Sequence, residues 1–229
     1  MTNDTLTNDT LTNDTLTAEA PATERLGDPR PALLSALATC GDLIHTVRPD
    51  ELERPTPCGD MDVRALLGHL VAVAQRIGWA ARQAPPAAWP TDVTGLADDE
   101  WAPAWHVAAI DAFAAWADDS LLEVDIEVPW ATLTGRGVVA IYTNEVVIHG
   151  WDLGQALGRP ASWGSMALET SLAAIHDQLP DADRGPLWAG VAASLPEGVP
   201  WSPPFANAVA VPDDAPLIDR LAGWNGRRP

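Results

Sequence analysis

Basic residues are scarce in this chain. Its 229 residues include 13 Lys and Arg against 32 Asp and Glu, which gives a formal net charge of -19. Proteins that bind duplex DNA or RNA use Lys and Arg to displace counterions from the phosphate backbone. We therefore expect no nucleic-acid partner.

Cysteines and long hydrophobic runs are also rare. Cys40 and Cys58 form no Cys-x-x-Cys motif and are too few for a disulfide framework, which indicates a reducing compartment. The sequence has no run of about 18 apolar residues that could cross a membrane. Its N-terminus lacks the basic start and apolar core of a secretion signal. These features predict a cytoplasmic protein with no membrane partner.

The composition is otherwise that of a folding chain, since 47% of the residues are hydrophobic and the length suits one substantial domain. Residues 2–16 repeat Thr-Asn-Asp-Thr-Leu three times and have too little apolar content to pack. We expect a disordered low-complexity tail over residues 1–28 and a helical bundle over 29–180. We expect residues 181–229 to be a C-terminal extension that packs on the bundle.

Hydrophobic periodicity predicts a mainly all-α fold. A short alternating stretch at 123–128 predicts a short strand or an extended link, and 129–137 reads as a loop that either covers a pocket or only connects. The segment 180–215 is rich in Pro, Gly and Asp and is expected to be irregular. Aromatic residues of the third helix, including Phe113, are expected to pack in the core. Helices are expected at about residues 32–47, 63–84, 98–118, 138–157, 166–179 and 216–224.

Glu145 and His149 lie four positions apart in the apolar run of the 138–157 segment, with Asp152 three positions further on. On a helix these three side chains share one face. A carboxylate and an imidazole are costly to bury unless they are paired, and a divalent metal pairs them directly. Mutual pairing or pairing with other helices is the alternative. His69, embedded in the apolar face of the 63–84 helix, is the candidate third ligand.

Several other residues could have either a functional or a purely structural role. Asp152 either orients a metal-ligating side chain through a hydrogen bond or forms a hydrogen bond to a nearby loop. Arg76, two turns after His69, could meet an anionic group of a substrate or form a surface salt bridge. Tyr142 and Trp130 either line a substrate pocket or belong to the core. Cys58 has no ligand partner at a recognisable spacing and is expected to be a buried structural thiol.

Three segments resemble the DinB-like metal-binding proteins, in particular the actinobacterial group that shares its N-terminal domain with mycothiol-dependent maleylpyruvate isomerase. The likeness covers about residues 29–229, although Met61 stands where that family often has Trp, and nothing after Leu179 is large enough for the isomerase's further C-terminal domain. It implies a DinB-like four-helix bundle with a divalent metal, commonly zinc, on His69, Glu145 and His149. The matching segments are Thr56-Pro57-Cys58 with residues 62–70, residues 145–153, and residues 211–216 with the ending Gly226-Arg227-Arg228-Pro229.

Two histidines and one carboxylate leave coordination positions open, as catalytic zinc sites do, although the same set also suits non-haem iron. With the resemblance, this predicts a metal-dependent transferase or isomerase that uses a low-molecular-weight thiol such as mycothiol on a small electrophilic molecule. The alternatives are a metal-dependent hydrolase or lyase that uses bound hydroxide, and a non-catalytic metal-binding stress-response protein. The oligomeric state is left open between monomer and homodimer.

Overall fold

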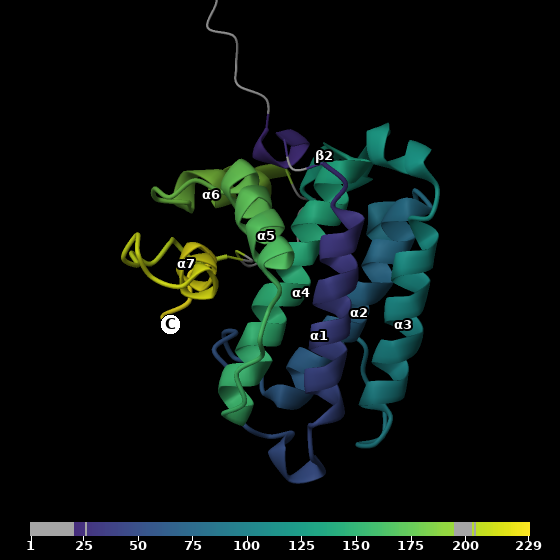
Figure 1. The fold of residues 1–229 in the computed structure, drawn as a ribbon, viewed down its shortest axis with the longest axis vertical. Helices are drawn as coiled ribbons and strands as arrows, with labels where there is room; N and C mark the ends of the chain where they lie inside the picture. The colour runs from purple at the N-terminus through teal and green to yellow at the C-terminus, as the bar shows by residue number, and fades with distance from the viewer. Residues whose placement is uncertain (1–20, 26, 195–202, 204) are drawn as a thin grey trace, which may run out of the picture.

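The fold is known from a computed structural model, which describes residues 21–25, 27–194, 203 and 205–229. Helices α1 to α4 run side by side, and α5 packs along α4 and α1 (Figure 1). The mainly all-α fold with a helical bundle is confirmed. The long helices are α1 (Arg30–His45), α2 (Val63–Ala81), α3 (Trp101–Ala115), α4 (Gly135–Leu157) and α5 (Ser165–Gln178), and the short 3-10 helices are η1 (Ala22–Arg25), η2 (Pro49–Glu51), η3 (Pro86–Ala88) and η4 (Asp119–Glu123).

The helices that carry the candidate ligands begin and end on local signals. The Asp62 side chain accepts a hydrogen bond from the Ala65 amide and caps α2, and the Thr134 hydroxyl accepts one from Gly137 and caps α4. Each cap satisfies a backbone donor that has no partner in the first helical turn. Gly158 ends α4 in the left-handed conformation, with φ of 64°.

The segment before α4 differs from the sequence prediction. The expected strand forms as β1 (Asp125–Val128), but it pairs antiparallel with a second strand, β2 (Ala131–Thr134). Residues 135–137, expected in a loop, are the first turn of α4. Gly135 permits this start because a Cβ there would lie 1.8 Å from the Leu121 carbonyl oxygen.

The C-terminal residues lie beside α5 and α4 rather than in the bundle (Figure 1). Helix α6 (Gly185–Ser194) forms where an irregular segment was expected, and α7 (Leu217–Trp224) follows close to its predicted range. The fully buried Arg184 joins this region because its guanidinium donates to the carbonyls of Pro180, Ala206 and Trp224. Asn225, just after α7, forms a buried two-way amide hydrogen bond with Asn144 of α4.

The tail predicted over residues 1–28 lies mostly outside the described residues. Within the described part, η1 already forms before the expected start of the bundle. Thr23 bonds to the Asp177 carboxylate through both its amide and its hydroxyl. Among the described helices, none is both long and apolar enough to cross a membrane.

Candidate metal centre

The three predicted ligands come together from two helices. His69 projects from α2, and Glu145 and His149 project from α4. One donor atom from each of the three lies within 4.8 Å of the others. The His69 and His149 rings meet edge to face, with centroids 4.7 Å apart and an interplanar angle of 79°. Side chains 76 to 80 positions apart thus meet at one point.

The spacing of one donor pair fits a small cation. His149 Nε2 lies 3.4 Å from Glu145 Oε2. That separation is long for a hydrogen bond, but two ligands bound at about 2.0–2.1 Å to a tetrahedral zinc ion are about 3.4 Å apart. The two imidazoles and one carboxylate are therefore a chemically suitable donor set.

Each imidazole is held from behind by a carboxylate. His69 Nδ1 lies 3.2 Å from Asp92 Oδ1, and His149 Nδ1 lies 3.3 Å from Asp152 Oδ2. Metal-binding histidines commonly donate their second N–H to a carboxylate, which fixes the tautomer and the ring orientation. Both rings can therefore present Nε2 as the ligand atom.

Burial and charge shape the protonation of the centre. Burial lowers the pKa of His69 even though Asp92 opposes the shift. Burial also disfavours the charged form of His149, but its contacts with Asp152, Cys58 and Glu145 outweigh burial and raise its pKa well above the usual value. Burial would raise the pKa of Glu145, but its contact with His149 and the nearby positive charges together lower it. The centre thus attracts positive charge, which a metal ion can supply in place of a proton.

Asp152 is also tied to the C-terminus. The Arg227 guanidinium donates to both carboxylate oxygens, at 3.2 and 2.8 Å, and to Cys58 Sγ at 3.5 Å. Cys58 Sγ in turn lies 3.7 Å from His149 Nδ1. Cys58, His149 and Asp152 are also close enough to form a second donor set. The Arg227 guanidinium already neutralises the negative charge of this second donor set, so we do not assign a second metal ion to it.

This geometry revises the expectation for Cys58 and reveals two residues that sequence reasoning missed. Cys58 is half-buried and touches a candidate ligand, so it is not an isolated core thiol. Asp92 lies in an irregular loop after η3, where no periodicity or spacing marks it. Arg227 belongs to the ending that carried the family resemblance, and that was its only signal.

The residues predicted to line a pocket lie near one another, around Tyr142. Arg76 donates to the carbonyls of Pro90 and Thr91, both at 2.6 Å, and forms no ion pair among the described residues. Tyr142 is buried one turn before Glu145, and its hydroxyl has no hydrogen-bond partner within the described structure. Trp130 is 43% exposed, and its ring centroid is 6.3 Å from that of Tyr142.

Gly68 allows the Asp92 loop to reach His69. The Val93 amide donates to the Gly68 carbonyl at 3.1 Å, and a Cβ on Gly68 would lie 2.3 Å from the Val93 oxygen. We expect Gly68→Ala to destabilise the protein by about 2 kcal/mol, because the loop backbone must move. Chemical denaturation measures this loss. Gly190→Ala is the control, since nothing lies within 4 Å of its Cβ position. Equal stabilities of the two variants would contradict the predicted loop contact.

Comparison with known proteins finds related sequences and a family model. Two uncharacterized proteins of Mycobacterium tuberculosis, from strains CDC 1551 and H37Rv, are each 27% identical to the chain over 201 residues. The matched region is 87% of this chain and 98% of each relative. No solved structure gives a significant match. The family model for the mycothiol maleylpyruvate isomerase N-terminal domain matches residues 33–154, which include His69, Glu145 and His149 but not Arg227. The chain therefore belongs to the mycothiol maleylpyruvate isomerase N-terminal domain family.

Proposed function

We propose that the chain binds one divalent metal ion, preferably zinc, through His69, Glu145 and His149. We further propose that it transfers or isomerises a small electrophilic molecule with the help of a mycothiol-type thiol. The observation that carries this proposal is the convergence of two carboxylate-oriented imidazoles and one carboxylate at a single point. Family membership supports the choice of a thiol cosubstrate.

Three protein ligands leave room for an exchangeable one. A divalent ion held by His69, Glu145 and His149 would supply Lewis acidity and would lower the pKa of a thiol or water molecule in the open position. The chain's own part is to hold the imidazoles in one orientation through Asp92 and Asp152. It also keeps the centre largely dry, since the side chains of His69 and Glu145 are each 14% exposed and that of His149 is 7% exposed.

Tyr142 and Arg76 are suited to hold an oxygen of the electrophile. Burial raises the pKa of Tyr142 although the charge of Arg76 opposes the shift, so the phenol stays protonated at neutral pH and can donate a hydrogen bond. Its hydroxyl has no internal acceptor in the described structure, which leaves that bond available for a ligand. Arg76 adds positive charge, and no carboxylate of the described chain is paired with it. This charge lowers the pKa of Glu145, His69 and Tyr142.

Cobalt substitution tests the thiol directly. Titration of the cobalt-loaded protein with mycothiol is expected to give a saturable change in the visible spectrum, and the analogue lacking the thiol should give none. Absence of both a spectral change and an electrophile adduct would overturn the thiol proposal. Activity that needs no thiol and rises with pH would instead select hydrolysis by metal-activated water.

Tyr142→Phe separates electrophile binding from metal binding. Because it removes only a hydroxyl, we expect unchanged metal content and unchanged thiol titration, with turnover reduced by about a hundredfold once a substrate is found. Phe113→Tyr, at an exposed site on α3, is a control that adds a hydroxyl on a helix that carries none of the three ligands. A Tyr142→Phe protein with full turnover would remove Tyr142 from the proposed site.

A further inference from the structure

One surface of the bundle, formed by α1 and α3, is apolar although nothing in the described chain covers it. Leu34 on α1 is 47% exposed, and Val107, Ile110 and Phe113 on α3 are 69%, 58% and 36% exposed. Phe113 was expected in the core. These four are the majority of the seven large hydrophobic side chains exposed in the described structure. Isolated exposed hydrophobics are ordinary, but a cluster of them indicates an interaction surface.

Helix α3 is apolar over most of its circumference. Trp101, Trp105, Ala108 and Ala112 face the interior, and the exposed residues include large hydrophobic side chains beside only one charged residue, Asp111, and one histidine, His106. A soluble helix with one exposed face normally places polar residues there, and a helix that is hydrophobic all round is normally buried. Helix α3 also lies at the outer edge of the bundle, where a second body can reach it (Figure 1).

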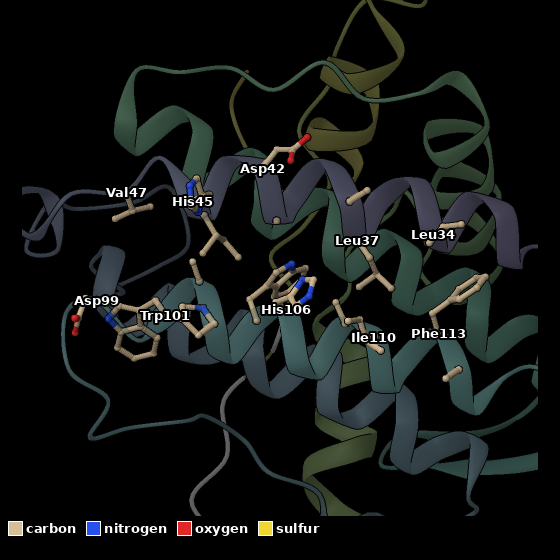
Figure 2. A pocket seen from close by; sticks show the side chains of 18 of the residues that line it. Leu34, Leu37, Asp42, His45, Val47, Asp99, Trp101, His106, Ile110 and Phe113 are labelled. Carbon is tan, nitrogen blue, oxygen red and sulfur yellow. The ribbon is translucent and has the colours of Figure 1, made fainter.

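A groove runs along this surface between the two helices, with a cavity volume of about 940 Å³. Small residues, namely Ala38, Gly41, Ala109 and Ala114, form part of its lining. Figure 2 shows Leu34, Ile110 and Phe113 gathered at one end of the groove, and His45, Asp99 and Trp101 at the other. The surface therefore offers both a protruding ridge, at Val107, Ile110 and Phe113, and a depression beside it.

We propose that this surface is the interface of a homodimer, in which the α1 and α3 helices of two copies form an intermolecular four-helix arrangement. An interface with two-fold symmetry requires a patch that complements itself. Residues spaced three apart on α3 form a ridge of the kind that packs into the groove of a facing helix. The groove lined by small residues, on the same patch, can receive the ridge of the second copy.

The size of the surface is adequate for a dimer of moderate strength. Two adjacent helices about 24 Å long and about 10 Å wide present roughly 500 Å² in projection. Side-chain relief raises the accessible area above the projected area, toward the roughly 800 Å² per partner of a standard interface. We therefore expect dissociation constants in the micromolar range rather than an obligate dimer.

The strong negative charge does not prevent this contact. The acidic residues that line the groove are Asp42, Asp98 and Asp99. Figure 2 shows Asp99 at the end away from Leu34 and Phe113, and Asp42 lies about two helical turns along α1 from Leu34. If two copies cross at the apolar end, these residues lie beyond the contact on opposite sides of the two-fold axis. The groove extends for about 17 Å from Leu34 to His45, which exceeds the Debye length of about 8 Å at physiological salt.

Sedimentation of the full-length protein from roughly 1 to 100 µM tests the proposal over the range expected for such an interface. The wild type is expected to shift from monomer to dimer. Ile110→Glu should weaken dimerisation by roughly a hundredfold, since each copy would bury an unpaired carboxylate. Met166→Glu is the matched control. Met166 is 49% exposed on α5, so this substitution introduces the same charge outside the α1–α3 surface.

Circular dichroism shows whether each variant keeps its fold, so a loss of dimer can be told from unfolding. A wild type that stays monomeric over the whole range overturns the proposal and leaves the surface to another occupant. A dimer that Ile110→Glu and Met166→Glu affect equally also overturns it. Neither outcome depends on metal binding or turnover, so this test is independent of the proposed function.

Discussion

Purified wild-type protein is expected to contain close to one equivalent of divalent metal, and His149→Ala is expected to contain almost none. His149 is the ligand that faces both His69 and Glu145, so its loss leaves one imidazole and one carboxylate. Loss of residues that only orient ligands costs about ten- to a hundredfold in affinity, so loss of the ligand itself should cost about a thousandfold or more. Elemental analysis and competition with a chromophoric chelator measure the effect.

His106→Ala is the control for this experiment. His106 is an exposed histidine of α3 with no candidate ligand as a partner, so its variant should retain the full equivalent of metal. Thermal unfolding with and without added zinc gives a second readout. Zinc should raise the unfolding temperature of the wild type and of His106→Ala, but not of His149→Ala. A His149→Ala protein that still binds one equivalent tightly would contradict the assigned centre.

The sequence was sufficient for the long helices α1 to α5, although not for α6, because the signals of the long helices are local. Apolar periodicity places α2 and α4 within a few residues of their observed ends, which the structure shows at the Asp62 cap and at Gly158. The face shared by Glu145 and His149 follows from helical geometry alone. That His69 meets them depends on the packing of α2 against α4, which periodicity cannot supply and which the family resemblance implied. The structure agrees with this juxtaposition, while metal binding itself stays a prediction.

The parts that sequence reasoning missed depend on contacts across long stretches of chain. Asp92 reaches His69 only because Gly68 lets the loop approach α2. Arg227 reaches Asp152 from 75 positions away, after the C-terminal region has packed beside α4. The early turn of α4 was missed because Gly135 reads as a loop residue, whereas here it allows a close backbone contact. In each case the deciding interaction joins segments that have no common periodicity.

Asp152→Asn is expected to weaken both the fold and the metal centre. The Asp152 side chain is fully buried and the Arg227 side chain is 9% exposed, so removing the carboxylate charge leaves a buried guanidinium without its counterion. Breaking a buried pair in this way should lower the free energy of unfolding by about 3 kcal/mol. Weaker orientation of the His149 ring should reduce metal affinity by about ten- to a hundredfold. Denaturation of the metal-free protein and chelator competition measure the two effects separately.

Acid conditions provide an internal check on the stability effect. Burial would raise the pKa of Asp152, but its hydrogen bonds with His149 and Arg227 prevail and lower that pKa below the usual 3.8. A carboxyl whose pKa is depressed by folding stabilises the protein above its unfolded pKa, and this stabilisation is lost as the pH falls through the folded pKa. The stability difference between wild type and Asp152→Asn should therefore be complete near neutral pH and shrink below about pH 4.

The double variant Asp152→Asn with Arg227→Met distinguishes the two roles of the carboxylate. Removing the guanidinium as well eliminates the unpaired buried charge, so much of the lost stability should return. Metal affinity should stay low, because the oriented contact with His149 Nδ1 is not restored. Recovery of both properties would mean that Asp152 serves only the contact with Arg227. If stability alone recovers, Asp152 joins the C-terminal residues to the metal centre while independently orienting one of its ligands.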